Sequence, residues 1–450
     1  MPSELRGSIP ASRRSSGRVV SVRTRFAPSP TGMLHLGGAR TALFDYLFAR
    51  HEGGEVLLRI EDTDRSRSHR RFEEAQLEDL AWLGLTFDGS PVRQSERGEL
   101  YREAAEKLLR SGFAYEKRDE SGRRALYFRP PLRRGSFHDG LRGEIHFSRI
   151  EDFVIMKSDG MPAYNFACVV DDAEMCITQV IRGEEHLSNT ARQVLLYRAL
   201  GLREPEFIHL GVVLGPDGKK LSKRSGATSV CEYRKDGYLP EALVSYLSLL
   251  GWSHPGGRED FRGLDELVRE FDPSRLHASP AIFDPKRLLA ANARRIRSLP
   301  AGELERLLEP ALDGAGIPPG RRPAAVEAIR SELRTLSEAP GLLSAITSPV
   351  DPEDFVRDLP RSSAEVYGWV AVMLEEREIE DVEDARRFVE EIRGRAREEG
   401  ISARELLHPL RLALTGREKG PGMPYIIAVL GVEESVRRIE AAREARLGAL

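Results

Sequence analysis

The chain has 450 residues, with 68 basic and 71 acidic side chains and a formal net charge of −3. This length predicts two to four domains with ample core, and the charges, abundant and mixed in sign, are typical of a soluble, cytosolic-type protein. The sparse cysteines (Cys168, Cys176 and Cys231) exclude a disulfide framework, no apolar run reaches membrane-spanning length, and the near-neutral total neither indicates nor excludes RNA binding.

The first 18 residues are rich in Ser, Arg and Pro. Such a segment could be an organellar transit peptide. It contains Glu4 and shows no amphipathic period, which favours a disordered tail.

A strand-to-helix turn follows between Arg25 and Arg40. Val20 and Val22 alternate with polar residues as in a strand, and prolines and glycines then interrupt regular structure. From Ala39 onward apolar residues recur at helical spacing. The residues just before that helix are His35, Gly37 and Gly38. A helix N-terminus attracts phosphate, and glycines let the phosphate approach the backbone.

A second strand is expected at Glu55–Ile60, which completes a βαβ unit. Glu61 follows at the carboxyl end of that strand, where open α/β sheets bind ligands. The turn is not a Walker P-loop, because no Gly-Lys-Ser/Thr closes it, and it is not the dinucleotide fingerprint, because its glycines have another spacing. Asp62 and Asp64 are expected to lie near a helix N-terminus rather than to hold a metal.

The stretch Arg25–Arg40 resembles the first signature of class I aminoacyl-tRNA synthetases, and its flank Arg25–Gly32 is similar to that of glutamyl-tRNA synthetases. The resemblance implies an α/β Rossmann-type parallel sheet with an inserted acceptor-binding domain, followed by an all-α C-terminal anticodon-binding region. It implies that Arg25, Ala27, Ser29 and Glu61 bind glutamate and that His35, Gly37 and Gly38 bind ATP.

Residues 101–172 are expected to be the inserted domain. Arginines, lysines, tyrosines and phenylalanines interleave between positions 115 and 137. This mixture suits single-stranded RNA ends, although a solvated hairpin surface has the same composition. Many bacterial relatives bind zinc here, whereas His138 and His146 have no cysteine nearby, so no zinc is expected.

Two further segments carry side chains that the resemblance assigns to the site. Val169 and Val170 can end a buried strand with Tyr164 near its start, and Arg182 ends another strand. The resemblance implies that Tyr164 contacts glutamate and Arg182 faces its side chain. It also implies that Glu185, His186 and Leu187 line the adenine and ribose. Without the resemblance, Tyr164 could equally be a core tyrosine with a bonded hydroxyl, and Arg182 could be one partner of a surface ion pair.

The glycine-flanked basic loop at 215–226 resembles the second class I signature, in the form Lys220-Leu221-Ser222-Lys223-Arg224. The resemblance implies that Lys220 and Lys223 bind ATP and neutralise the departing pyrophosphate. It implies that His35 acts with them in catalysis. Without the first signature, a solvated basic loop would be the simpler interpretation.

The remaining chain is expected to be mainly helical, with helices at Asp384–Glu399, Ala403–Leu414 and Glu433–Leu447. The predicted divisions are a tail at 1–18, the two halves of the Rossmann domain at 19–100 and 173–229, the insertion at 101–172, a stem-contact domain at 230–298 and the anticodon-binding region at 299–450.

The implied activity is ATP-dependent attachment of glutamate to tRNA(Glu), with Mg²⁺ accompanying ATP, no protein metal site, a cytoplasmic location and a monomeric state. Glutamate carries two carboxylates and one ammonium, which suit Arg182, Arg25 and Glu61 respectively. A site that pairs a carboxylate rejects the amide, which predicts glutamate rather than glutamine.

Several alternatives stay open at this point. The enzyme could also charge tRNA(Gln), or it could be a catalytically inactive tRNA-binding paralogue, although intact His35, Lys220 and Lys223 argue against the latter. The enzyme that glutamylates queuosine on tRNA(Asp) lacks a helical C-terminal half, and glutaminyl-tRNA synthetases have a β-barrel anticodon region.

Overall fold

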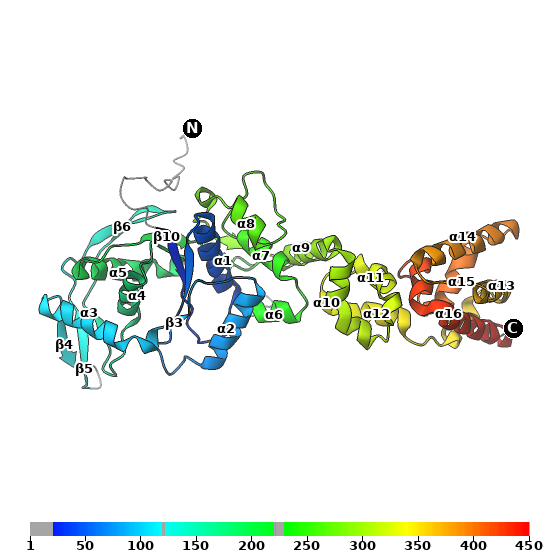
Figure 1. Cartoon of the computed structure of the whole chain (residues 1–450), viewed down its shortest axis with the longest axis horizontal. Helices are drawn as coiled ribbons and strands as arrows, with labels where there is room; N and C mark the ends of the chain where they lie inside the picture. The colour runs from blue at the N-terminus through cyan, green and yellow to red at the C-terminus, as the bar shows by residue number, and fades with distance from the viewer. Residues whose placement is uncertain (1–20, 119–121, 220, 222–228, 450) are drawn as a thin grey trace. The chain divides into compact units, whose positions relative to one another are not determined.

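The computed structural model describes residues 21–118, 122–219, 221 and 229–449. Its contacts divide the chain into two compact units (Figure 1). Unit 1 consists of Met1–Lys235 with Pro240–Ala291, and unit 2 of Asp236–Leu239 with Asn292–Leu450. No described helix has both the length and the apolarity needed to cross a membrane. The finer domain boundaries predicted from the sequence stay predictions.

Unit 1 is built on parallel strands. One sheet has the order β1 (Arg23–Phe26), β2 (Glu55–Ile60), β3 (Val92–Arg93). Another has the order β7 (Gly143–Phe147), β6 (Gly135–Asp139), β10 (Glu206–Leu210), β9 (Gln179–Gly183), with only the β6–β7 pair antiparallel. Hydrogen bonds between Arg23 and Thr178 join β1 to the start of β9. The carboxyl ends of β1, β2, β9 and β10 therefore meet at one edge, as the βαβ pattern predicts.

The helices beside these strands are α1 (Leu36–His51), α2 (Arg70–Trp82), α3 (Gly98–Arg110), α4 (Tyr164–Glu174) and α5 (Leu187–Leu200). Helix α1 begins at Leu36, three residues earlier than its apolar pattern indicates, because the His35 side chain caps it. The expected strand ending at Val170 is wrong, since Tyr164 begins a helix. Phe166–Val170 are all buried, and a continuous apolar run does not distinguish a buried strand from a buried helix.

The segment predicted as an insertion contributes to two sheets. Strands β4 (Ala114–Arg118), β5 (Arg124–Phe128) and β8 (Phe153–Met156) form an antiparallel sheet of their own. Strands β6 and β7 instead join β10, with Asp139 opposite Phe207. Phe128, Phe137, Phe166 and Phe207 belong to one buried cluster, so this segment and the strands that follow it share a hydrophobic core.

Shorter elements complete unit 1: η1 (Gln94–Glu96), η2 (Glu184–His186), β11 (Val213–Leu214), α6 (Val230–Lys235), α7 (Pro240–Ser248), α8 (Leu264–Glu270), η4 (Pro273–Arg275) and β12 (Ala281–Ile282). Arg40 on α1 donates hydrogen bonds to the carbonyls of Leu250, at 2.9 Å, and Gly211, at 2.5 Å. A buried guanidinium thus fixes α1 against the segments that follow β10 and α7.

The described part of unit 2 is helical (Figure 1). Its helices are α10 (Ala301–Gly314), α11 (Arg322–Arg330), α12 (Ala339–Thr347), α13 (Ser363–Glu375), α14 (Val382–Glu398), α15 (Ala403–Thr415) and α16 (Met423–Gly448), preceded by α9 (Pro285–Ser298), with 3-10 turns η5 (Pro319–Arg321), η6 (Leu336–Glu338), η7 (Pro352–Asp354) and η8 (Val356–Asp358). The helices predicted at Asp384 and Ala403 are confirmed. The helix predicted at Glu433–Leu447 is also confirmed: it is the part of α16 that follows a break at Gly431, whose φ is 76°.

Candidate active site

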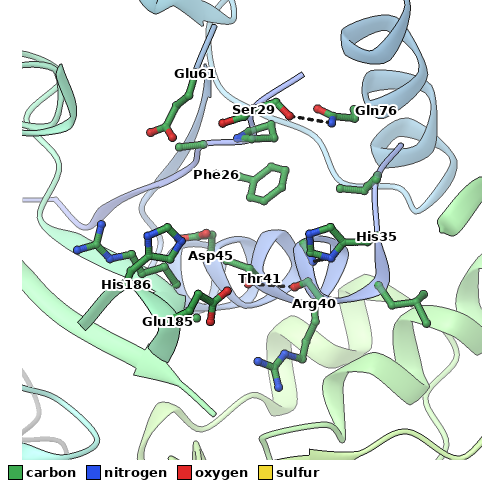
Figure 2. A pocket seen from close by; sticks show the side chains of 18 of the residues that line it. Phe26, Ser29, His35, Arg40, Thr41, Asp45, Glu61, Gln76, Glu185 and His186 are labelled. Carbon is green, nitrogen blue, oxygen red and sulfur yellow. Dashed lines mark hydrogen bonds between the residues drawn. The ribbon is translucent and has the colours of Figure 1, made fainter. Parts of the chain in front are cut away.

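A cavity of about 690 Å³ opens where β1, β2 and β9 end and α1 begins. Eleven of the residues predicted for the site line it: Arg25, Ala27, Ser29, His35, Gly37, Gly38, Glu61, Tyr164, Arg182, Glu185 and His186. Figure 2 shows Glu61 and Ser29 across the cavity from His35 and Thr41. Leu187 instead packs against the hydrophobic core cluster. Lys220 and Lys223 lie outside the described residues, although Leu221 between them lines the cavity.

The N-terminus of α1 forms one wall. His35 Nδ1 accepts a hydrogen bond from the Gly38 amide at 3.0 Å. A neutral imidazole that accepts at Nδ1 carries its proton on Nε2 and can donate from there. A Cβ on Gly37 would lie 3.1 Å from His35 Nδ1, which is tighter than ordinary contact, so glycine keeps this turn compact. The wall therefore offers an imidazole donor beside the positive end of a helix dipole.

Glu61 is held by a buried cluster behind the cavity. Arg59, which is completely buried, donates to Glu61 Oε1 at 3.1 Å, and the Cys168 thiol lies 3.2 Å from the same oxygen. Both contacts use Oε1, which leaves Oε2 for the cavity side. A carboxylate held in this way suits a cationic ligand group.

Asp172 joins the two arginines of this cluster. Its Oδ1 accepts from Arg25 Nε at 3.0 Å and from Arg59. Burial raises the pKa of Asp172, but the charges of Arg25 and Arg59 outweigh burial and hold that pKa at about 2. Asp172 is therefore ionised at neutral pH and orients Arg25 at the cavity wall.

Arg182 has a different environment. It donates from Nη2 to Thr190 Oγ1 at 2.6 Å and Gln193 Oε1 at 2.7 Å, and from Nε to His209 Nε2 at 3.4 Å. None of the ion pairs formed by the described residues includes Arg182, and its Nη1 is buried without a hydrogen-bond partner among them. A buried guanidinium with unpaired charge requires an anion, because an isolated buried charge is strongly unfavourable.

Tyr164 and His186 lie between these groups, with the Tyr164 hydroxyl 3.1 Å from His186 Nδ1. Burial and the charge of Arg182 lower the pKa of His186 to about 4, so the imidazole is neutral at pH 7. Burial raises the pKa of Tyr164, which keeps its proton. Tyr164 and His186 therefore contribute polar atoms but no charge to the cavity lining.

Sequence reasoning missed the residues that support the cavity lining: Asp45, Arg59, Gln76, Asp172, Thr190, Gln193 and His209. Asp45 lines the cavity, is fully buried, and has neither carboxylate oxygen paired within the described chain. Its spacing of seven residues from Gly38 on α1 could have indicated it. Gln76 donates to the Ser29 and Gly32 carbonyls, which holds the turn in place.

Unit 2 contains a second, smaller cavity of about 90 Å³. It lies among α11, α12 and α15, and its lining includes Arg411, Arg417 and Lys419. Arg411 Nη1 donates to the Pro421 carbonyl at 2.6 Å. Glu332 also lines this cavity, so its lining has mixed charge with an excess of cations.

No cluster of three or more His, Cys, Asp or Glu side chains that could hold a metal ion occurs among the described residues. This result leaves the expected absence of zinc a prediction.

Comparison with known proteins gives consistent matches over the whole of this architecture. Residues 21–126 and 116–290 match the model of the catalytic domain of class I tRNA synthetases (E and Q), and residues 293–443 match that of an anticodon binding domain. Glutamate–tRNA ligase 1 of Rubrobacter xylanophilus is 64% identical over 429 residues, covering 95% of this chain and 99% of that protein. Glutamate–tRNA ligase 1 of Pseudothermotoga lettingae is 41% identical, covering 93% and 99%.

Solved structures agree. The crystal structure of a glutamate tRNA ligase from Elizabethkingia meningosepticum in complex with its amino acid matches with a TM-score of 0.85 and 30% identity, covering 94% of this chain and 99% of that one. Glutamate-tRNA synthetase from Elizabethkingia anophelis matches with a TM-score of 0.83 and 30% identity, covering 94% and 100%.

Proposed function

The chain belongs to the class I tRNA synthetases for glutamate and glutamine and is a glutamate–tRNA ligase, and we propose that the cavity of unit 1 is where it activates glutamate. The full-length similarity to glutamate–tRNA ligases does not favour an inactive tRNA-binding paralogue. The charges that line the cavity match those of glutamate and ATP, so individual side chains can be given roles.

The observation that carries the amino-acid assignment is the environment of Arg182. Its buried Nη1 has no partner among the described residues, and the acceptors of its other nitrogens are a hydroxyl, an amide and an imidazole. The side-chain carboxylate of glutamate supplies the missing anion. Glutamine would leave the buried charge unpaired, so the cavity discriminates against it.

The other two charges of glutamate have partners in the same cavity. Glu61, oriented by Arg59, binds the ammonium group, and Arg25, oriented by Asp172, helps to hold a carboxylate. Ala27 and Ser29 line the turn between these side chains, and Tyr164 adds a hydroxyl donor. The arrangement fixes glutamate at three points, which positions its α-carboxylate for attack.

ATP occupies the part of the cavity beside α1. His35 and the turn of Gly37 and Gly38 contact its phosphates, while Glu185 and His186 lie on the side assigned to the nucleoside. Mg²⁺ accompanies the phosphates, as hard cations with few protein ligands do in such sites. Lys220 and Lys223 neutralise the charge that develops on the departing pyrophosphate.

The reaction has two steps. An oxygen of the glutamate α-carboxylate attacks the α-phosphate of ATP, which forms glutamyl-adenylate and releases pyrophosphate. The terminal ribose hydroxyl of tRNA(Glu) then attacks the acyl carbon and releases AMP. Because the protein forms no covalent bond, its contribution is orientation and charge stabilisation.

For the tRNA, residues 101–172 receive the acceptor end, residues 230–298 contact the stem, and the helical region binds the anticodon. Arg411, Arg417 and Lys419 at the smaller cavity of unit 2 offer cations for a contact with tRNA phosphates. The enzyme works as a cytoplasmic monomer, and charging of tRNA(Gln) is a second possible activity.

Aminoacylation with labelled glutamate and labelled glutamine tests these assignments on separate transcripts of tRNA(Glu), tRNA(Gln) and tRNA(Asp). Charging of tRNA(Glu) with glutamate alone is the expected result. Charging with glutamine alone would refute the substrate assignment. Charging of tRNA(Asp) would move the enzyme to the queuosine-modifying group, while charging of tRNA(Gln) with glutamate would show the second activity.

A further inference from the structure

Arg182 is supported from behind by a chain of buried side chains that do not reach the reacting atoms. His209 on β10 and Thr190 on α5 are both completely buried. His209 Nε2 lies 2.9 Å from Thr190 Oγ1 and 3.4 Å from Arg182 Nε. On the opposite side of the ring, Nδ1 lies 2.6 Å from Asp139 Oδ2. The imidazole therefore connects a carboxylate on β6 to the guanidinium on β9.

The position of Asp139 fixes the tautomer of this ring. An ionised carboxylate only accepts hydrogen bonds, so His209 Nδ1 carries the proton and donates it. Nε2 then has one lone pair, which faces Arg182 Nε–H at 3.4 Å and the Thr190 hydroxyl at 2.9 Å. That hydroxyl also lies 3.1 Å from the His186 carbonyl. Burial and the charge of Arg182 lower the pKa of His209, although Asp139 opposes them, so the ring is neutral near pH 7.

Asp139 is itself rigidly placed. Its Oδ2 also accepts the backbone N–H of His209 at 3.1 Å, and its Oδ1 accepts the amides of Leu141 and Arg142 at 3.0 and 2.9 Å. Four donors thus hold the carboxylate in one orientation. The ring that it contacts has little freedom to turn.

Because His209 is neutral, the hydrogen bond that Arg182 makes to it leaves the positive charge of the guanidinium unpaired. A carboxylate in contact with Arg182 would pair its charge and compete with a bound anion. His209 orients the guanidinium without neutralising it. Thr190 and Gln193 do the same from α5.

We propose that His209 is a positioning residue for glutamate, which acts through Arg182 by fixing its guanidinium at the cavity wall while leaving its charge unpaired. The inference rests on the proposed role of Arg182 as the partner of the side-chain carboxylate.

Two matched substitutions separate positioning from packing. In His209→Asn the amide nitrogen can still donate to Asp139, but no acceptor reaches Arg182. In His209→Gln the amide oxygen can take the place of Nε2. The measurement is steady-state charging of tRNA(Glu) by the full-length enzyme, with separate KM values for glutamate and ATP, beside melting curves for each variant.

His209→Asn is expected to raise the KM for glutamate by about 10- to 100-fold, as expected for a lost hydrogen bond to a charged group. The KM for ATP and kcat should stay within about twofold, and His209→Gln should stay within about threefold of wild type. Equal effects of the two substitutions, equal changes in both KM values, or no change in His209→Asn would overturn the proposal.

A second pair keeps the test decisive if the ring substitutions prevent folding. Thr190→Val removes the hydroxyl that touches both His209 and Arg182, and Thr190→Ser retains it. Thr190→Val should raise the KM for glutamate about tenfold or more, and Thr190→Ser should not; equal values would overturn the proposal. If the wild-type enzyme charges tRNA(Glu) with glutamate while His209→Asn and Thr190→Val keep the wild-type KM for glutamate, only the positioning role fails. If the wild-type enzyme does not charge tRNA(Glu) with glutamate, the proposed function fails too.

Discussion

Replacing Asp172 with asparagine tests the buried cluster that orients Arg25 and Glu61. The carboxylate is 3% exposed and accepts from Arg25 and Arg59, which are 4% and 0% exposed. Its pKa in the folded protein is about 2, against roughly 3.9 in an unfolded chain. That difference corresponds to about 2–3 kcal/mol of folding free energy at pH 7. Because the substitution also leaves two buried cations less neutralised, we expect a total loss of about 3–5 kcal/mol.

The pH dependence has a defined sign. The pKa of Asp172 is lower in the folded than in the unfolded protein, so its contribution is complete above about pH 4 and declines as the pH falls toward 2. The difference between wild type and Asp172→Asn should therefore be constant between pH 5 and 8 and shrink below pH 4.

Urea unfolding followed by tryptophan fluorescence measures this difference. Trp82 and Trp252 lie in unit 1 and Trp369 in unit 2, so a Trp369→Phe background reports on unit 1 alone. Asp64→Asn is the matched control, because Asp64 also has a pKa lowered to about 2, by Ser66 and Arg67, but lies at the surface. Its midpoint should barely move. Equal midpoints for Asp172→Asn and wild type would refute the account of the cluster.

Three further predictions concern other parts of the chain. Burial raises the pKa of Asp79 to about 6, so Asp79→Asn should stabilise unit 1 above pH 6, with the gain disappearing below about pH 4 in melting curves; a gain that persists at pH 4 would contradict this. Arg417→Ala should weaken binding of tRNA(Glu) and lower the slope of log Kd against log salt by about 1, with the KM for glutamate unchanged, whereas an unchanged slope would remove Arg417 from the RNA contact. Lys223→Ala should slow adenylate formation about 100-fold with little change in glutamate binding, and a near-normal rate would remove the loop from the mechanism.

Local patterns predicted much of the fold and the cavity lining. Strand β2 matches the predicted Glu55–Ile60, and Arg182 and Glu61 lie where two parallel strands end, as the βαβ pattern requires. The family resemblance supplied the roles, since a strand-end arginine is often only a surface ion pair. The structure adds that Arg182 is buried and has no charged partner within the described chain.

The supporting residues could not be predicted in the same way, because their partners are distant in the sequence. Arg25 and Asp172 are 147 positions apart, and Asp139 and His209 are 70 apart. The Asp139–His209 contact depends on β6, from the segment predicted as an insertion, pairing with β10, and the Arg25–Asp172 contact joins β1 to α4. No local periodicity encodes either contact. The mistaken strand at Val170 has a similar origin, because burial on all sides removes the periodicity that distinguishes a helix.

The central claim is that the unpaired charge of Arg182 selects glutamate by its side-chain carboxylate. The most direct measurement is the ratio of kcat/KM for glutamate to kcat/KM for glutamine in charging of tRNA(Glu), for wild type and Arg182→Gln. We predict that the substitution lowers kcat/KM for glutamate by about 100- to 1,000-fold and leaves that for glutamine within a few-fold, so that the ratio collapses. An unchanged ratio, with both amino acids affected equally, would contradict the claim.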